Sequence, residues 1–416
     1  MSNYICKLCA RFKIKLSMKL NHILLNKLAR HFTICSVFLL IIFCEACSSA
    51  VEEDALDSHE DVFIKIDPER QTNPLNNSQY SIDSVRSLSM PANKIFQISK
   101  LIVKDNRIYI LDSEIARTVF VFDTTGRYLY KLGERGRALS EYIGRPVDFF
   151  VDKHNDVHVF DRDGQKIIVF KKDGNPTRVI GTSSSFPYTF GLIDHNNYAY
   201  CVQCPNPDKK NNTPALLISD ITGENTKNIL YLRNTYTYIP SERMFFKNGD
   251  RLSHIPIMSD SVLVFKNDSI EKVIHFDFKG KFLTKVKPEL ATANVTSGQK
   301  WDVKGLVWGL LKYQETDSLS MLEYTYDRSF MFWLKNKKNG EIINAQSIID
   351  GICPFTYYYL RGNQIVAFID EEFVKAIRAN AGSEITKKQL SETSPQIKDV
   401  FEGKIPTPAI IYISIR

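Results

Sequence analysis

Short apolar segments separated by tight turns recur along the chain at a nearly constant interval. In each copy a turn precedes the last strand, and the equivalent turn positions are Gly126, Gly174, Gly223, Asp268 and Gly340. Their successive spacings are 48, 49, 45 and 72 residues. A period near 48 residues with several short strands per copy is typical of the blades of a β-propeller. Glycine and aspartate suit these turns because tight hairpins need a backbone with positive φ.

The first complete copy contains the four strands that one blade requires. Residues 101–103, 108–112, 119–122 and 128–130 are mostly apolar and are joined by turn residues. These segments show consecutive apolar residues instead of alternation, as expected where neighbouring sheets cover both faces of a strand. The pattern therefore predicts four-stranded antiparallel sheets that pack face to face.

The number of blades follows from the length that the repeats occupy. The 72-residue step predicts an insertion near 284–319, and apolar residues at helical spacing predict a helical insertion at 371–405. When both are set aside, 285 of the 356 residues in 61–416 remain, which corresponds to about six copies. The predicted fold is an all-β, six-bladed β-propeller with a helical insertion in the last blade.

The last blade is expected to combine strands from both ends of the repeat region. Residues 355–360, 364–370 and 409–415 have the composition of three strands. The segment 62–66 is expected to supply the fourth strand. A sheet shared between the two ends of the chain closes the ring without a disulfide.

The first 46 residues have the features of a signal peptide. They hold seven basic residues and one acidic residue, and residues 32–43 form an apolar run of 12 residues. Such a run suits the core of a signal peptide and is too short to span a bilayer as a helix. Ala46 and Cys47 follow, which resembles the lipobox of bacterial lipoproteins with Cys47 as the lipid attachment site. An ordinary signal peptide or an uncleaved anchor is the alternative, and Met18 is a candidate true start.

Residues 47–60 are polar and acidic and are predicted to form a flexible tether. The run Glu52-Glu53-Asp54 resembles the export signal of surface lipoproteins in some anaerobic Gram-negative bacteria, and a solvated linker is the alternative. We therefore expect an outer-membrane lipoprotein held by a lipid anchor. It is expected to be exposed at the cell surface, or otherwise to face the periplasm.

The positive net charge belongs to the N-terminal segment. The whole chain has 54 Lys and Arg against 47 Asp and Glu, whereas the chain without residues 1–46 has 47 basic and 46 acidic residues. A nearly neutral body gives no support for nucleic-acid binding, which needs a net basic face. We expect no nucleic-acid partner, and we expect a monomer.

The first two copies share a set of motifs, which are residues 107–112, 121–126, 133–136, 141–142 and 147–152. These motifs resemble those of the six-bladed β-propeller lipoproteins of anaerobic Gram-negative bacteria, which are relatives of the NHL-repeat propellers. Where that family usually carries Gly-Pro-Gly before Glu-Tyr, this chain has Ala138-Leu139-Ser140. The resemblance supports the fold and location and implies no settled enzymatic activity.

The loop from Gly133 to Pro146 links the first two blades and is the main candidate for ligand binding. Its end is expected to lie on the face of the ring where the inner strands begin. Arginine and tyrosine are common anchors in binding sites. A solvated connection between blades is the alternative. The candidate binding residues are Arg135, Arg137, Tyr142 and Arg145 in the loop, together with Tyr188, Arg243 and Trp308 on the same face.

Motifs of established catalysis are missing from the sequence. It contains no G-x-S-x-G, H-E-x-x-H, Walker or EF-hand pattern. Cys201 and Cys204 form a single C-x-x-C pair, which argues against zinc and leaves unpaired thiols, a local disulfide or a redox dithiol open. The recurrent Asp112, Asp161 and Asp370 could bind Ca²⁺ at one rim or cap the following turns. We expect no cofactor, with Ca²⁺ in the channel as the alternative.

Two functions remain compatible with the sequence. The first is a surface-anchored, non-catalytic binding lipoprotein that takes a glycan, a peptide or a protein partner. The alternative is an NHL-like propeller enzyme, a lactonase or lyase with a metal in the central channel. The sequence favours the first, because it carries no recognisable catalytic motif.

Overall fold

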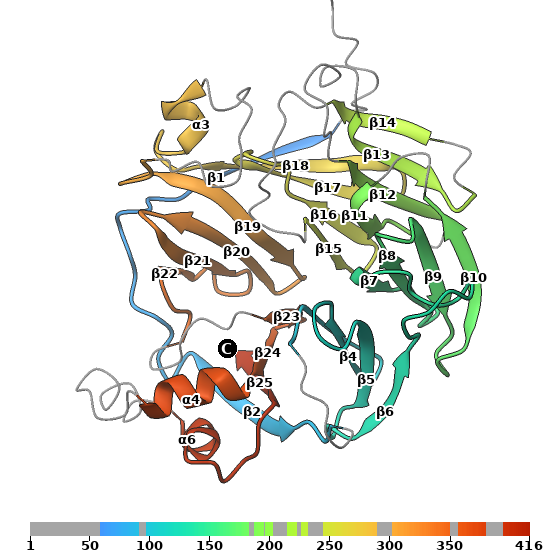
Figure 1. Ribbon diagram of the computed structural model, residues 1–416. Helices are drawn as coiled ribbons and strands as arrows, with labels where there is room; N and C mark the ends of the chain where they lie inside the picture. Colours follow the sequence, from blue (N-terminus) through green and yellow to red (C-terminus); the bar gives the residue numbers. More distant parts are fainter. Residues whose placement is uncertain are drawn as a thin grey trace, which may run out of the picture. The chain divides into compact units, whose positions relative to one another are not determined.

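Six sheets are arranged in a ring around a central channel (Figure 1). The computed structural model describes residues 59–90, 97–182, 187–194, 196–202, 214–222, 226–231, 244–288, 302–349, 357–379 and 394–416. These residues belong to the unit Leu56–Arg416. Cys47, Cys204, Gly223 and Arg243 lie outside the described residues. The predicted six-bladed β-propeller is confirmed.

The first three sheets each contain four consecutive antiparallel strands. The strand nearest the channel comes first in the chain, and the following strands lie progressively farther out (Figure 1). The strands are β3 (Lys100–Lys104), β4 (Arg107–Asp112), β5 (Thr118–Asp123), β6 (Tyr128–Leu132), β7 (Pro146–Val151), β8 (Val157–Asp161), β9 (Lys166–Phe170), β10 (Pro176–Gly181), β11 (Pro187–Leu192), β12 (Asn197–Val202), β13 (Pro214–Asp220) and β14 (Thr226–Tyr231).

The fourth sheet has a fifth strand that the repeat pattern does not predict. Its first four strands are antiparallel, and β1 pairs in parallel with the outer strand β18. On β1, the carboxylate of Asp61 lies 2.8 Å from Nε2 of His275, and the ring of Phe63 stacks on His275 with centroids 4.8 Å apart. The strands are β15 (Phe245–Asn248), β16 (Arg251–His254), β17 (Ser261–Lys266), β18 (Ser269–Asp277) and β1 (Glu60–Lys65).

The last sheet closes the ring with a strand from each end of the described chain. Its order is β23 (Tyr358–Arg361), β24 (Gln364–Ile369), β25 (Ala409–Ile415) and β2 (Tyr80–Ser87). The prediction that residues 62–66 supply the fourth strand is therefore wrong, because these residues overlap β1 in the fourth sheet. Residues 80–87 are rich in serine and charged side chains, which suits an outer strand with one wet face and hides it from a search for apolar runs.

The predicted insertion at 284–319 is too long. The inner strand of the fifth sheet, β19 (Val307–Glu315), lies inside it and contains Trp308. The sheet continues with β20 (Leu319–Tyr326), β21 (Ser329–Asn336) and β22 (Ile342–Ala345). Before it comes the short helix α3 (Leu283–Val286), and residues 289–301 are outside the described part.

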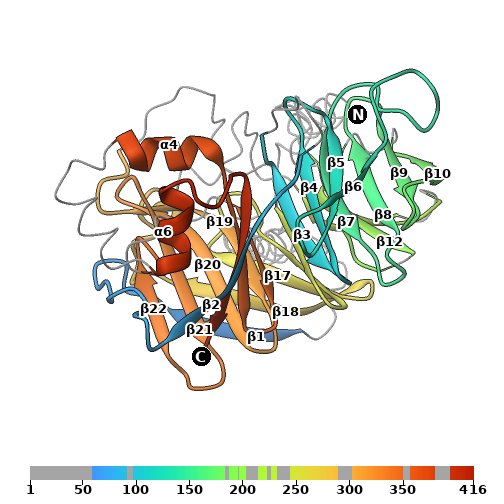
Figure 2. The same cartoon turned by 90° about the horizontal axis from the view of Figure 1, so that it is seen from below.

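The helical insertion predicted after β24 is confirmed. It contains α4 (Glu371–Ala379) and α6 (Pro395–Phe401), which lie beside the closing sheet in Figure 2. Asp370 accepts a hydrogen bond from the backbone N–H of Phe373 in the first turn of α4. Val374, Ile397 and Val400 are buried in the same apolar cluster as strands β24 and β25. No helix in the described part of the chain has the length and apolar character needed to cross a membrane.

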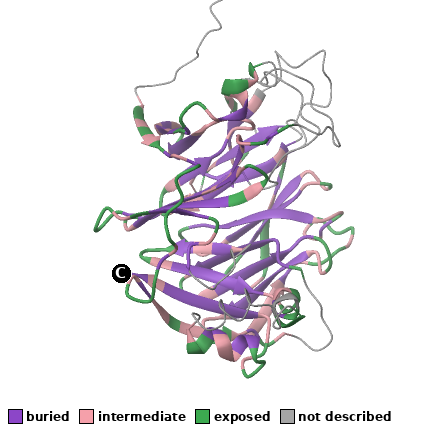
Figure 3. Ribbon diagram, turned by 90° about the vertical axis from the view of Figure 1, so that its left-hand side faces the viewer, coloured by how far each residue is buried: buried purple, intermediate pink, exposed green. Residues whose placement is uncertain are grey.

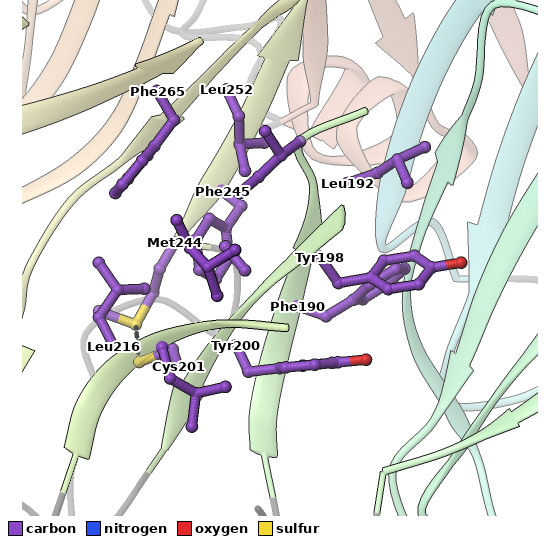
Figure 4. Packing of buried hydrophobic residues seen from close by; sticks show 14 of the residues in the cluster. Phe190, Leu192, Tyr198, Tyr200, Cys201, Leu216, Met244, Phe245, Leu252 and Phe265 are labelled. Carbon is purple, nitrogen blue, oxygen red and sulfur yellow. Dashed lines mark hydrogen bonds between the residues drawn. The ribbon is translucent and has the colours of Figure 1, made fainter. Parts of the chain in front are cut away.

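Apolar side chains fill the spaces between neighbouring sheets, so that strands are buried and connecting loops are exposed (Figure 3). Between the third and fourth sheets, Sγ of Cys201 lies 3.7 Å from Sδ of Met244 (Figure 4). Cys201 is a free, buried thiol in the described structure. Burial raises the pKa of this thiol to about 12, so it stays protonated and behaves as an apolar side chain.

Two recurrent aspartates cap turns, as one of the two readings of the sequence predicts. The carboxylate of Asp112 accepts the backbone N–H groups of Ile115 at 2.8 Å and of Gln97 at 2.9 Å. Asp161 accepts the N–H of Ile143 at 2.8 Å in the equivalent place. Gln97 and Ile143 each lie on the segment that enters the first strand of the same sheet. Each buried carboxylate therefore fixes the loop that enters its own blade.

The turn glycines also behave as predicted where they are described. Gly126 has φ +91°, and a Cβ atom at this position would lie 2.1 Å from the carbonyl oxygen of Ser87. Gly174 and Gly340 also have positive φ. In the fourth copy the positive φ falls on Asn267 instead of Asp268.

The different positions of β1 and β2 generate a test by truncation. A chain that starts at Ile66 lacks only the outer strand β1, and we expect it to stay soluble with a melting temperature lower by about 5 °C at most. A chain that starts at Leu88 also lacks β2 and leaves β25 as an unpaired edge. We expect this chain to be insoluble or to melt at least ~10 °C lower, measured by circular dichroism. Equal melting of the two truncated chains would show that β2 does not close the ring.

Candidate functional site

The inner strands enclose a cavity of about 630 Å³ in the central channel. Its walls come from β3, β7, β15, β19 and β23, with further residues from β20 and β21. The lining residues include five cationic residues and only two acidic ones, although the body of the protein is nearly neutral. They are Lys100, Lys104, Lys247, Lys312 and Arg361 against Asp105 and Glu323.

Lys100 has a structural partner. Its Nζ lies 2.6 Å from a carboxylate oxygen of Asp148 and 3.6 Å from the centre of the Phe150 ring. Asp148 is 0% exposed, and the hydroxyl of Thr189 lies 3.3 Å from its other carboxylate oxygen. This contact joins the inner strands of the first three sheets. A paired buried charge of this kind contributes to the structure, since removing one partner leaves the other uncompensated.

Lys104, the last residue of β3, has no such carboxylate partner. Its Nζ donates a hydrogen bond of 2.6 Å to the backbone carbonyl of Asp152. The carboxylate of Asp152 accepts the N–H groups of His154 and Asp156 and lies 3.4 Å from Nε2 of His158. Among the described residues, no carboxylate lies within ion-pair distance of Lys104. Burial lowers the pKa of Lys104.

Lys247 on β15 also has a backbone carbonyl, and not a carboxylate, as the partner of its ammonium group. Its Nζ donates to the backbone carbonyl of Ile193. The nearby Asp194 uses its carboxylate to accept the N–H groups of Asn196 and Asn197 at 2.7 and 2.9 Å. Burial lowers the pKa of Lys247 to about 8; the negative charge of Asp194 opposes this shift, and the positive charge of Lys104 adds to it. Within the described part of the chain, Lys247 also makes no ion pair with a carboxylate.

Lys104 and Lys247 approach the same end of the channel from opposite sides. Their strands β3 and β15 belong to the first and fourth of six sheets, and both residues lie at or near the end of an inner strand. The two ammonium groups are half-buried and repel each other, and neither has a carboxylate within ion-pair distance, although Asp152 and Asp194 offset part of the charge from farther away. An anion placed between them would relieve both effects. We call this pair the lysine pair.

The opposite wall carries aromatic and mixed polar groups. Nζ of Lys312 donates to the carbonyl of Tyr358 at 2.6 Å and lies 3.5 Å from the centre of its ring. Glu323 on β20 lies opposite Lys312 on β19 in the strand register. Burial raises the pKa of the Glu323 carboxyl group. Phe332 contacts the Tyr358 ring edge-on, whereas Phe330 at the start of β21 is 57% exposed.

The predicted binding anchors that the structure describes lie outside this cavity, and Tyr142 requires a correction. Tyr142 is 0% exposed, and its hydroxyl donates to the carbonyl of Leu132 at 2.7 Å. It therefore packs the loop onto the core and presents no aromatic face to a ligand. The Gly136 N–H donates to the Tyr142 carbonyl and fixes the same loop.

The other predicted anchors divide into engaged and projecting residues. Arg145 forms an ion pair with Glu114, and Tyr188 lies beneath the guanidinium of Arg162 at 4.8 Å. Trp308 lies at the start of β19 and has a buried indole N–H. Arg135 and Arg137 project from the loop and are exposed, whereas Arg243 is outside the described residues.

The sequence contains a signal for the lysine pair that our prediction missed. In a propeller the first strand of each repeat lines the channel, so a charged residue inside that strand faces the channel or its rim. Lys104 directly follows Leu101-Ile102-Val103, and Lys247 directly follows Phe245-Phe246. The apolar pattern ends the first of these strands at Val103, one residue before Lys104, and the run Phe245-Phe246 is too short to mark a strand by itself.

The described residues contain no group of three or more His, Cys, Asp or Glu side chains that could hold a metal ion.

The fold and the channel define a six-bladed β-propeller with an electropositive cavity on its axis. Within that class the chain belongs to the family described as "Domain of unknown function (DUF4934)", whose model matches residues 63–400. No curated protein sequence matches the chain.

Solved structures resemble the protein in fold. A "putative exported protein" from Bacteroides fragilis is 14% identical, with 86% of this chain and 99% of that chain covered and a TM-score of 0.66. A member of the duf4221 family from Bacteroides vulgatus is 8% identical, with 81% and 98% covered and a TM-score of 0.46. Virginiamycin B lyase from Staphylococcus aureus is 11% identical, with 70% and 82% covered and a TM-score of 0.38. The first of these structures supports the propeller fold.

The lowered pKa of Lys247 predicts a stability effect with a defined pH dependence. Between pH 8 and 10.5 the unfolded chain keeps the Lys247 proton and the folded protein does not, so wild-type stability rises with pH across this window. Lys247→Met removes the buried charge, and we expect it to be more stable than wild type at pH 7 by on the order of 2 kcal/mol. The difference should shrink towards pH 10.

Urea unfolding at pH 7 and near pH 10 measures this effect. Lys153→Met, which changes an exposed lysine on the loop after β7, is the matched control and should match wild type at both pH values. A Lys247→Met variant that is equally stable or less stable at both pH values would show that the charge of Lys247 carries no cost in the folded protein.

Proposed function

We propose that this protein is an exported, lipid-anchored binding protein that holds a small anionic ligand in the central channel of its propeller. The observation that carries the proposal is the lysine pair. Lys104 and Lys247 line one cavity, approach it from opposite sides, and have carbonyl oxygens instead of carboxylates as partners in the described structure. A carboxylate between them would supply the missing counter-charge and form charge-assisted hydrogen bonds.

The size and lining of the cavity support a small-molecule ligand. A volume of about 630 Å³ lies within the range of ~300–1,000 Å³ that is common for ligand pockets. The walls combine aromatic rings with a few charged groups, which is the usual composition of such sites. A protein partner would instead meet the rim, where Arg135 and Arg137 project.

Export and anchoring are supported by the N-terminal sequence. Cys47 follows an apolar run that suits a signal peptide, and a polar segment separates it from β1. The similar structure from Bacteroides fragilis bears the name of an exported protein, which agrees with this proposal. The anchor would hold the propeller at the membrane while leaving the channel in solvent.

A panel of small carboxylates tests the channel. We expect citrate, succinate or galacturonate to raise the melting temperature at pH 7, while the neutral sugar galactose does not, because ligand binding to the folded state stabilises it. Lys247→Met should abolish the increase. Arg135→Ala/Arg137→Ala should retain it and serves as the matched control. If no carboxylate raises the melting temperature, or if the loop variant loses the effect, the channel proposal is wrong.

The pKa of Lys247 gives the binding a pH dependence. The ammonium form is present below about pH 8 and is lost as the pH rises through that value, so affinity for the anion should fall in the same direction. By titration calorimetry with the tightest binder of the panel, we expect about tenfold weaker binding at pH 9.5 than at pH 7. Lys247→Arg keeps its charge and should hold its affinity to higher pH. Affinity that is independent of pH in wild type would argue against a role for Lys247.

The anchor has a separate test. Cys47→Ser removes the thiol that would be acylated, and we expect the full-length protein to move from the membrane fraction to the soluble fraction, because acyl chains would supply the attachment. Immunoblotting of fractionated cells measures this change. Cys44→Ser is the control and should remain in membranes. A Cys47→Ser protein that still partitions fully with membranes would disprove lipid anchoring at this residue.

A further inference from the structure

We infer that the ligand of the channel is an acidic oligosaccharide of at least two sugar residues, with its terminal carboxylate at the lysine pair and its next ring stacked on Phe330. The inference rests on the proposed function and adds the chemical class and the orientation of the ligand. Three features of the cavity carry it: the distance between its two ends, the exposed aromatic ring, and the polar groups between them.

The lysine pair and Phe330 lie at different levels of the cavity, and Phe330 is on β21, the third strand outward from the channel. Lys100 opens β3 and Lys104 closes it, so the ends of this strand are about 13 Å apart at the usual rise per residue. Phe330 is the second residue of β21, next to the pairs Ser329–Tyr326 and Tyr326–Val307. Since Val307 begins the inner strand β19, Phe330 lies at the level where inner strands begin. One pyranose ring is too short to reach from there to Lys104.

Phe330 is a suitable platform for a ring. It lines the cavity and is 57% exposed, whereas Phe332 two residues later on the same strand is buried. An exposed phenyl ring at the mouth of a cavity offers a flat apolar face. The apolar face of a sugar ring is flat and complementary to it, while the hydroxyl groups at the edge of the sugar remain free for polar partners.

The polar groups between the two ends argue against an apolar acid. Lys312 and Glu323, which are opposite each other on β19 and β20, line the same cavity, whereas Asn248 follows Lys247 at the lysine end. A fatty acid would bury these groups against methylene groups, which neither donate nor accept hydrogen bonds, and burying polar groups in this way costs free energy. Sugar hydroxyls both donate and accept, so they match a wall that presents an ammonium group and a carboxyl group. The carboxyl of Glu323, whose pKa is raised by burial, can itself donate to a hydroxyl when protonated.

Titration calorimetry with full-length protein at pH 7 tests the inference. The probes are digalacturonate, the unsaturated disaccharide of hyaluronan, galacturonate, neutral galactobiose and succinate. We expect at least one acidic disaccharide to bind about tenfold or more tightly than galacturonate and succinate, and galactobiose to show no binding. Lys247→Met should remove the binding of all acidic probes.

Phe330→Ala distinguishes the two ends. We expect it to weaken the acidic disaccharide by about tenfold and to leave galacturonate unchanged, because the monosaccharide is held at the lysine pair alone. Ile342→Ala alters another exposed apolar residue, outside the cavity, and is the matched control.

Two outcomes would overturn the inference. If succinate binds as tightly as both acidic disaccharides, or if Phe330→Ala has no effect on the disaccharide, the ligand is not the proposed oligosaccharide and the channel remains an anion site. If no acidic probe binds, including succinate and galacturonate, the anion site of the proposed function fails as well.

Discussion

The antiparallel pairing of β2 with β25 is the contact on which the propeller depends. A ring of sheets buries every apolar face only if the last sheet meets the first, and this pairing brings together residues more than 300 positions apart in the sequence. The strand β25 is almost wholly buried, so its edge would otherwise expose both apolar side chains and unpaired backbone groups. Once the ring is closed, the inner strands are held at a fixed distance around the axis. The channel and its cavity are a consequence of that closure.

The cavity differs from the rest of the interior in how its charges are compensated. The charge of Lys100 is compensated by the carboxylate of Asp148, which also contacts Thr189. Lys104 and Lys247 show another, in which backbone carbonyls hold the ammonium groups and the neighbouring carboxylates of Asp152 and Asp194 are already used to fix turns. Partly desolvated charges without a direct ion-pair partner lower stability, and natural proteins retain such features mainly at functional sites. The lack of a direct carboxylate partner distinguishes the lysine pair from Lys100 in the same cavity.

The sequence predicted the fold well because the repeat is a local signal. Turn glycines, consecutive apolar residues and the aspartates that cap each blade all lie within one copy, and the structure confirms Gly126, Asp112 and Asp161 in these roles. The closing strand escaped prediction because β2 carries few apolar residues and its partner is distant in sequence. The candidate site escaped for a related reason. Arg135 and Arg137 stand out in a loop, whereas Lys104 and Lys247 gain their meaning only when the ring places two separate strands across one cavity. Tyr142 resembled a surface anchor because no local pattern shows that its loop folds back onto the core.

The parallel strand β1 gives the protein a mechanical arrangement that the propeller itself does not require. The polypeptide before Glu60 reaches the folded body through β1, on the outer edge of the fourth sheet, whereas the seam of the ring lies in the sixth. A pull on that N-terminal segment therefore loads the contacts of β1 with β18, including Asp61 with His275, before it loads β2. Under such a load β1 can detach from β18 while β2 stays paired with β25, so the ring remains closed and the shape of the channel is preserved.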